Sequence, residues 1–357
     1  MTYPSGPYGY GYAPPPPPPK PGVIPLAPLG LSQILTGAFA TVGRYWKQLL
    51  GVAVAAYGAA LLLIAAAFGI AYALVADHLP GVFDLPSGQE PSWDDGLPLL
   101  IAFGAVWLVG LVGMLVASAV VYAACPVVLQ EAVLGRRTTF GAVWRRSWSR
   151  MPAVIGTVFL TSLILFVPVA LFVLAMIGFV VALATAAADE TTGTGVFSPG
   201  VAVLAFLLAL AAMPLATWIW VKLSLAPSAA VFEGQGAMAS MRRSNELVRG
   251  SWWRIFGALL VAGIMAGVAN WLIQQVFGLL VTTPFSFAES SGYETGSEVL
   301  IALVPVVVLL LLGGMVAQAF CSVFPPLVTG LVYVDQRIRK ENLAPALAQA
   351  AGTPFSP

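Results

Sequence analysis

The chain has 357 residues, of which 59% are hydrophobic and only 9% are charged, and its formal net charge is +1. Soluble domains carry roughly 25% charged residues, so this composition excludes an ordinary soluble protein and predicts a polytopic membrane protein. A net charge close to zero gives no overall field that would attract nucleic acid, and we expect no nucleic-acid partner.

The N-terminal segment, residues 1–28, is rich in Pro, Gly and Tyr and includes six consecutive prolines, Pro14 to Pro19. Such a composition favours extended polyproline geometry and has no apolar periodicity with which to build a core. We therefore expect a disordered cytoplasmic tail, with a ligand for an aromatic-lined groove as the alternative. The segment lacks the charged start and short apolar core of a cleavable signal, so the first span should be an uncleaved anchor.

Six apolar stretches follow the tail, and each is long enough to cross a bilayer core of about 30 Å, which requires about 20 residues. They lie near residues 48–76, 98–125, 152–184, 200–225, 255–281 and 299–330. The predicted fold is therefore all-α, an integral membrane protein with six transmembrane helices.

The charges between these stretches predict how the chain is threaded through the membrane. All 16 Lys and Arg residues lie on one side, whereas ten of the 15 acidic residues lie on the other, in segments 77–97, 185–199 and 282–298. Cytoplasmic segments retain positive charge during insertion. The pattern predicts a multi-pass protein of the cytoplasmic membrane with both termini in the cytoplasm.

A unit of roughly 100 residues recurs three times along the chain. Prolines stand at the inner end of each even-numbered stretch: Pro126, Pro227, and the pair Pro325 and Pro326. An amphipathic segment with apolar residues at helical spacing precedes each odd-numbered stretch, near residues 31–46, 140–149 and 238–252. We predict three hairpin repeats, each preceded by a cytoplasmic interfacial helix. The expected boundaries are 29–130, 131–233 and 234–335 within a membrane domain 29–335, followed by a short cytoplasmic tail, 336–357.

Residues that perform catalysis or hold a metal ion are scarce. Histidine, the usual general base and metal ligand, occurs once, as His78 beside Asp77 at the outer end of the first stretch. Cys125 and Cys321 lie in apolar stretches without the spacing of a metal or redox motif, and we expect them to be buried as small hydrophobic residues. The sequence therefore predicts no enzyme, no cofactor and no metal site.

Two groups of polar residues are candidates for contacts with lipid or with other helices. Arg145, Arg146, Arg242 and Arg243 belong to the amphipathic segments and are expected to face anionic lipid. Asn270 and Gln274 lie four residues apart on one face of the fifth stretch, where interhelical hydrogen bonding explains them more simply than substrate binding. Gly263 and Gly267 form a GxxxG pair on the same helix.

A third group is acidic. Glu131, Glu233 and Asp335 follow the repeated prolines at successive intervals of 102 residues. If the three units pack around a pseudo-threefold axis, these acids meet neighbouring arginines at the cytoplasmic face. The alternative is local pairing at the surface with Arg136, Arg242 or Arg337, which contributes only about 0–1 kcal/mol for each pair.

Two segments resemble a known membrane domain. Residues 232–260, FEGQGAMASMRRSNELVRGSWWRIFGALL, resemble the most recognisable part of the domain that accompanies some bacterial glycerophosphoryl diester phosphodiesterases, and residues 28–51 resemble its opening. The likeness covers roughly residues 28–335. In the full enzymes the chemistry belongs to a separate soluble barrel with metal-binding carboxylates and several histidines. The resemblance therefore implies the membrane domain without that activity, as in proline-tailed proteins often found in actinobacteria.

The sequence thus predicts a non-enzymatic scaffold or accessory subunit that binds anionic lipid through basic interfacial helices and has an unidentified membrane-protein partner. The alternative is a small-molecule or lipid transporter, or a channel-like protein. A polar-lined cavity reaching Asn270 and Gln274 would favour the transporter, whereas a closed apolar interior would favour the scaffold.

Overall fold

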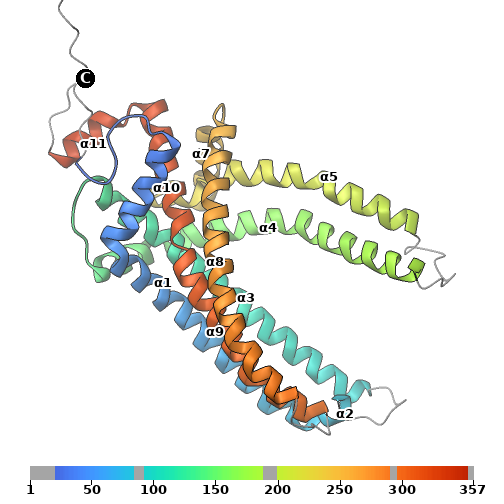
Figure 1. Cartoon of the computed structure of the whole chain (residues 1–357). Coiled ribbons are helices and arrows are strands. Elements are labelled where there is room, and N and C mark those ends of the chain that lie inside the picture. Colours follow the sequence, from blue (N-terminus) through green and yellow to red (C-terminus); the bar gives the residue numbers. More distant parts are fainter. Residues whose placement is uncertain (1–20, 84–91, 188–198, 290–295, 353–357) are drawn as a thin grey trace, which may run out of the picture.

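The computed structural model describes residues 21–83, 92–187, 199–289 and 296–352 (Figure 1). These residues form helices joined by short connections, and no strand occurs among them. Six of the helical segments within these ranges are long and apolar enough to cross a membrane. The predicted all-α, polytopic fold is therefore confirmed.

The helices follow the three predicted units in order. The first unit contains α1 (Leu31–Val75), the 3-10 turn η1 (Ala76–His78), α2 (Pro80–Phe83) and α3 (Trp93–Val133). The second contains α4 (Phe140–Ala187), α5 (Pro199–Leu223) and α6 (Ala226–Glu233). The third contains α7 (Ala237–Val248), α8 (Trp252–Glu289), α9 (Gly296–Cys321), α10 (Phe324–Glu341) and α11 (Ala344–Ala351).

The amphipathic segments differ from the expectation in two of the three units. The first is the beginning of α1, where only a kink at Tyr45 (φ −119°, ψ 23°) separates it from the apolar part of the helix. The second runs without a break into the rest of α4. Only the third is a separate helix, α7, because Gly250 (φ +84°) adopts a left-handed conformation that interrupts the chain before α8.

The repeated prolines end helices in the second and third units. α5 ends at Leu223 and α9 ends at Cys321, and the next helix starts in each case with proline in its first turn, Pro227 in α6 and Pro325 in α10. Proline suits the first turn because its missing amide proton would have no helical partner there. Pro126 lies inside α3 and does not end it.

The three hairpins meet at one end, and the α4–α5 hairpin diverges from the other two. In Figure 1, α1, α3, α8 and α9 run side by side, whereas the α4–α5 hairpin leaves the common end in a different direction. We call the common end the basic platform. It consists of residues 21–30, the end of α3, the start of α1 and of α4, and helices α6, α7, α10 and α11.

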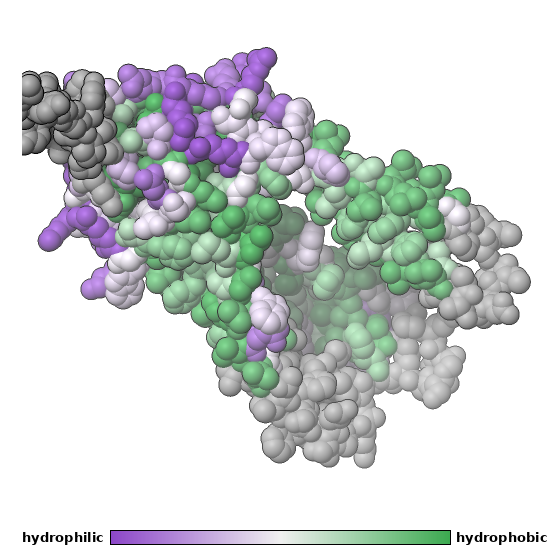
Figure 2. All heavy atoms as spheres, turned by 45° about the horizontal axis from the view of Figure 1, so that its top comes forward, coloured by the Kyte–Doolittle hydropathy of each residue, from purple (hydrophilic) through white to green (hydrophobic). Residues whose placement is uncertain are grey.

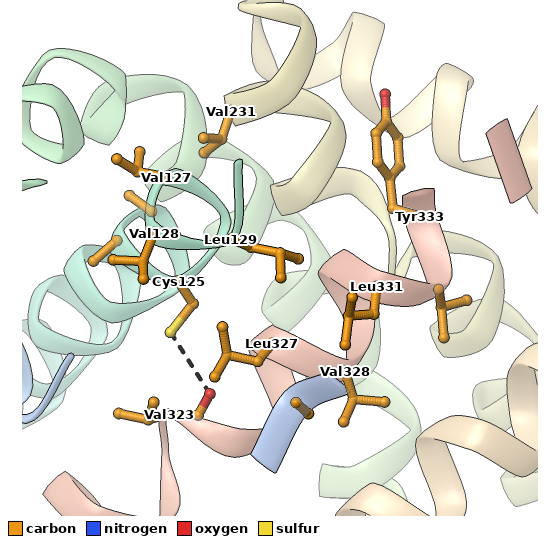
Figure 3. Packing of buried hydrophobic residues seen from close by; sticks show 14 of the residues in the cluster. Cys125, Val127, Val128, Leu129, Val231, Val323, Leu327, Val328, Leu331 and Tyr333 are labelled. Atoms are coloured by element: carbon orange, nitrogen blue, oxygen red, sulfur yellow. Dashed lines mark hydrogen bonds between the residues drawn. The ribbon is translucent and has the colours of Figure 1, made fainter. Parts of the chain in front are cut away.

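The hydrophobic core lies in this platform. Figure 3 shows Cys125 and Leu129 from α3 packed near Leu327 of α10, with Val231 of α6 close by, and all are buried. The Cys125 thiol donates a hydrogen bond of 3.6 Å to the Val323 carbonyl oxygen. The segments that follow the repeated prolines therefore join the three units.

The apolar arms, by contrast, leave large side chains uncovered. Leu62 and Phe103 are 73% and 72% exposed in the isolated chain, and apolar residues cover the arms in Figure 2 whereas polar residues gather on the platform. A soluble protein rarely exposes so much contiguous apolar surface, but hydrocarbon solvates it as well as another helix does. The chain is an integral membrane protein.

The ordered domain extends beyond the expected limits, residues 29 and 335, at both ends of the chain. Ile24 and Leu26 are buried, and the Val23 amide donates to the Ala132 carbonyl oxygen at 3.1 Å, so residues 21–28 belong to the platform rather than to a loose tail. At the other end α10 continues to Glu341 with Ile338 buried, and α11 packs through Ala348. Both segments pack against the platform because they contain apolar side chains that become buried there. Residues 1–20 lie outside the described residues.

Candidate functional site

Asp335 is a buried acid at the centre of the platform, with a side chain only 1% exposed. Its carboxylate accepts hydrogen bonds from the Leu29 amide (2.8 Å), from Arg254 Nη2 (3.1 Å) and from Arg339 Nε (2.9 Å). Both arginines also donate to the Leu29 carbonyl oxygen. The cluster therefore joins the N-terminal segment to α8 and α10.

Glu233, the last residue of α6, has a side chain 15% exposed and forms a second cluster. It accepts hydrogen bonds from Arg243 Nε at 2.9 Å and from the Tyr333 hydroxyl. Arg243 also pairs with Glu341 of α10. Burial disfavours the charge of Arg243, but its hydrogen bonds with Glu233 and Glu341 raise the pKa of the guanidinium above its ordinary value. This cluster joins α6, α7 and α10.

Glu131 forms a third pair. Arg146 donates from Nη1 to Glu131 Oε1 at 3.2 Å and from Nη2 to Gln130 Oε1 at 2.8 Å. The Glu131 side chain is 22% exposed and that of Arg146 is 53% exposed, so this pair is the most solvated of the three. It joins the end of α3 to the start of α4.

The three acids thus share a role in connecting the units: each follows a hairpin and bonds to the segment that starts another unit. Glu131 reaches α4, Glu233 reaches α7, and Asp335 reaches residue Leu29 before α1. Their partners differ from those that proximity in the sequence suggested. Arg136 donates instead to the Ala350 carbonyl oxygen, and Arg242 pairs with none of the three acids. Arg337 bonds Glu341 at 2.8 Å and also pairs, at 3.9 Å, with Glu233 rather than with Asp335.

Lys340 adds a further connection between α10 and α7. Its ammonium lies 2.7 Å from the Arg249 carbonyl oxygen, 2.8 Å from that of Leu247 and 3.3 Å from that of Glu246. The last carbonyl groups of a helix have no partner within it and carry its partial negative charge. A cation placed here satisfies them and fixes the end of α7.

The four candidate lipid-facing arginines divide into two kinds. Arg146 and Arg243 are engaged in the ion pairs just described. Arg145 and Arg242, each one residue earlier in the chain, are exposed, and their side chains form no hydrogen bond or ion pair with the residues that the structure describes. Their charges are free to meet a ligand outside the protein.

Aromatic residues lie at the start of the apolar arms, and on α4 they flank Arg145 in the sequence. The rings of Phe140, Trp144 and Trp148 stack along one side of α4 with centroids 5.9 and 6.0 Å apart. On the other hairpins, Trp46 is 51% exposed and Trp253 is 78% exposed. Tryptophan is enriched at the boundary between bilayer hydrocarbon and water, so these residues form a predicted interfacial belt that includes the part of α4 carrying Arg145.

The polar residues of the fifth stretch lie on the side of α8 that faces α9. Asn270 and Gln274 are half-buried, and a Cβ atom added to Gly314 would lie 3.4 Å from Gln274 Nε2. A Cβ added at Gly263 or Gly267 would meet nothing within 4 Å, so the GxxxG pair is not used for packing among the described residues.

A cavity of about 230 Å³ lies elsewhere, at the point where the hairpins separate. Its walls come from α3, α4, α5, α6, α8 and α10, and neither Asn270 nor Gln274 lines it. Five hydroxyl-bearing residues line it: Tyr122, Thr161, Ser162, Ser224 and Thr329.

His78, Cys125 and Cys321, the residues considered for catalysis or metal binding, do not form a common cluster. His78 Nδ1 lies 3.0 Å from Asp95 Oδ1 at the end opposite the platform, and Asp77 is not its partner. Cys125 is buried, as expected, whereas Cys321 is only partly buried. Among the described residues no group of three or more His, Cys, Asp or Glu side chains is placed to hold a metal ion.

Several residues that connect the platform were not identified as site residues from the sequence. Arg254 and Arg339 complete the Asp335 cluster, Tyr333 bonds Glu233, and Lys340 caps α7. Arg339 follows Asp335 by four residues, a spacing that places two side chains on one side of a helix and was a usable signal. The other three contacts join residues about 81 to 100 positions apart, and no local pattern indicates them.

Comparison with curated proteins and with solved structures gives no match. Residues 130–327, more than half of the chain, match a family described as a domain of unknown function, DUF7847. The matched region runs from the end of α3 to the first turn of α10 and contains both Glu131 and Glu233. The chain therefore belongs to the DUF7847 family.

Proposed function

We propose that the protein is a non-enzymatic scaffold or accessory subunit of the cytoplasmic membrane, and that its basic platform binds anionic lipid headgroups from the cytoplasmic side. The observation that carries the proposal is the division of neighbouring arginines into paired and free residues. Arg146 and Arg243 hold the platform together, whereas Arg145 and Arg242 are exposed without an acidic partner in the described chain.

Electrostatics supports this assignment. A basic residue close to an anionic membrane surface contributes about 1 kcal/mol to its attraction, and the attraction falls off within a Debye length. Arg145 lies on α4 among the stacked rings of Phe140, Trp144 and Trp148, and such interfacial aromatic residues support a position of its guanidinium group near lipid phosphates. The charge asymmetry between the two sides of the spans supports the orientation, with the platform and both termini in the cytoplasm.

The test compares free and paired arginines in the same protein. Three purified proteins are reconstituted in mixtures of phosphatidylglycerol and phosphatidylcholine: the wild type, Arg145→Gln/Arg242→Gln and Arg146→Gln/Arg243→Gln. In each experiment only one of the two lipids carries brominated acyl chains. Quenching of tryptophan fluorescence then measures the enrichment of each lipid around the protein.

We expect Arg145→Gln/Arg242→Gln to lose enrichment of phosphatidylglycerol without loss of thermal stability, and added salt to reproduce the loss in the wild type. Arg146→Gln/Arg243→Gln should lower the melting temperature instead. An equal change for both lipids in the first variant would contradict the proposal.

The absence of enzymatic activity has its own test. The resemblance to phosphodiesterase-associated membrane domains suggests glycerophosphodiesters with a divalent metal ion as the substrates to try. We expect no release of glycerol phosphate by the purified protein, because metal-assisted hydrolysis requires a metal site with an activated water molecule. Turnover that disappeared in His78→Ala would contradict this part of the proposal.

A further inference from the structure

The cavity between the hairpins has a buried wall and an exposed edge. Leu259 and Ala262 of α8 form a buried floor, whereas Ser162 of α4 and Gly263 of α8 are exposed at its edge. Figure 2 shows the molecule hollowed between the α4–α5 arm and the rest. The cavity therefore opens sideways, toward the space that bilayer lipid occupies around the apolar arms.

The depth of the cavity corresponds to the boundary between hydrocarbon and headgroups. It is lined by Leu223, where α5 ends, by Ser224 in the following turn, and by Pro227 in α6. Lys222, at the same level, has its ammonium 3.5 Å from the centre of the Trp218 ring. Lysine and tryptophan occupy the interfacial region of a bilayer, where the ester groups of glycerolipids also lie.

Three of the five hydroxyl groups that line the cavity differ from the other hydroxyl groups of the described spans. Ser224 and Thr329, which also line it, donate to the carbonyl oxygens of Val221 and Pro325. Elsewhere Ser118, Thr157 and Thr217 donate to carbonyl oxygens of their own helices, which is how hydroxyl groups are normally satisfied in apolar surroundings. The hydroxyls of Tyr122 and Thr161 make no hydrogen bond with any residue that the structure describes, and the same is true of Ser162.

An unpaired hydroxyl in an apolar environment costs free energy. Ser162 is exposed and Tyr122 and Thr161 are half-buried, so all three groups are accessible to a hydrogen-bonding partner from outside the chain. None of the described residues that line the cavity is charged, which favours a neutral acceptor over a phosphate group. Its volume of about 230 Å³ is below the roughly 300 Å³ of sites that enclose a whole small molecule. It is suited to hold part of a longer molecule.

We propose that this cavity holds one glycerolipid from the leaflet on the platform side, with its ester carbonyl oxygens accepting hydrogen bonds from Tyr122, Thr161 and Ser162. The first carbons of the acyl chain lie against Leu259 and Ala262, and the rest of the chain remains in the bilayer. The site is separate from the free arginines, so either assignment can fail without the other.

Two glycines on α8 provide a matched pair of variants. Gly263 lines the cavity and Gly267 lies one turn further along the helix outside it, and a Cβ added to either would meet nothing within 4 Å. Lipid that stays bound to Gly263→Leu and Gly267→Leu is counted by native mass spectrometry after purification from the same membranes. We expect Gly263→Leu to retain one lipid fewer than the wild type and Gly267→Leu to retain the same number.

The hydroxyl groups are tested by Thr161→Val/Ser162→Ala against Thr217→Val, whose hydroxyl bonds Met213 and does not line the cavity. The first variant should lose the same lipid and the second should keep it, with melting temperatures measured to confirm folding. Equal lipid retention by folded Gly263→Leu and the wild type, or loss of lipid only from Thr217→Val, would overturn the proposal.

Discussion

The Leu29 amide donates a hydrogen bond of 2.8 Å to the Asp335 carboxylate across 306 residues of sequence. The bond joins the segment before the first hairpin to the helix that follows the last hairpin. Together with the Glu131–Arg146 and Glu233–Arg243 pairs, it connects the three units at the basic platform. Among the described residues no ion pair joins the apolar arms of different units, which are linked by weaker contacts such as the hydrogen bond of 3.4 Å from Gln318 Nε2 to the Tyr57 hydroxyl. The platform is therefore the part of the molecule in which we expect mutations to affect stability most.

Among the three acids, Asp335 should be the one whose substitution lowers the stability of the protein most. Asp335→Asn keeps the shape of the side chain but removes the charge that compensates Arg254 and Arg339. Loss of one member of a buried ionic group costs about 3–5 kcal/mol, and we expect a clearly lower melting temperature in detergent. Glu246→Gln is the control, because Glu246 is 69% exposed and 3.8 Å from Arg243. A smaller effect for Asp335→Asn than for Glu246→Gln would show that the cluster does not stabilise the platform.

The N-terminal segment should tolerate no side chain at Gly22. A Cβ atom there would lie 2.0 Å from the Ala132 carbonyl oxygen, whereas one at Gly43 would meet nothing within 4 Å. We expect Gly22→Ala to displace the segment and to cost about 1–3 kcal/mol, as overpacking does elsewhere. Gly43→Ala, within α1, should be neutral or stabilising. Limited proteolysis near residues 21–30 measures the displacement, and equal cleavage of both variants would contradict the packing of this segment.

The Glu341 carboxylate should make the platform sensitive to acid. Burial opposes its charge, but hydrogen bonds from Arg337 and Arg243 dominate and lower the pKa of Glu341 below its ordinary value. Its contribution to stability is therefore complete above the unfolded pKa of about 4.3 and is lost as the pH falls through the lower folded value. Melting temperatures between neutral pH and the acid limit should decline less for Glu341→Gln than for the wild type. Parallel curves would show that another group causes the decline.

The orientation can be tested with single cysteines. In a background with Cys125→Ala and Cys321→Ala, we expect Asp94→Cys to react with an impermeant maleimide added to intact cells. Arg137→Cys should react only after the membrane is permeabilised, because both residues are exposed but lie on opposite sides of the spans. The reverse pattern would place the platform outside the cell and would contradict the proposed contact with cytoplasmic anionic lipid.

The sequence by itself determined the fold class and the six spans. A helix that crosses a bilayer must present about 20 apolar residues in succession, and this requirement is local and readable in the chain. The repeated prolines correctly indicated where α5 and α9 end, because the geometry of proline acts on its own turn. Amphipathic periodicity identified the polar and apolar sides of the interfacial segments, but it did not reveal that two of them are continuous with their spans.

Only the tertiary structure decided which charged residues pair and where the cavity lies. Arg145 and Arg146 are alike in sequence, and so are Arg242 and Arg243, yet one of each pair bonds an acid while the other is exposed. That difference depends on the direction of each side chain relative to a helix from another part of the chain, as does the bond between Leu29 and Asp335. The cavity depends on the angle at which the α4–α5 hairpin leaves the platform (Figure 1). Such relationships arise from packing between distant segments, and a pattern confined to neighbouring residues does not contain them.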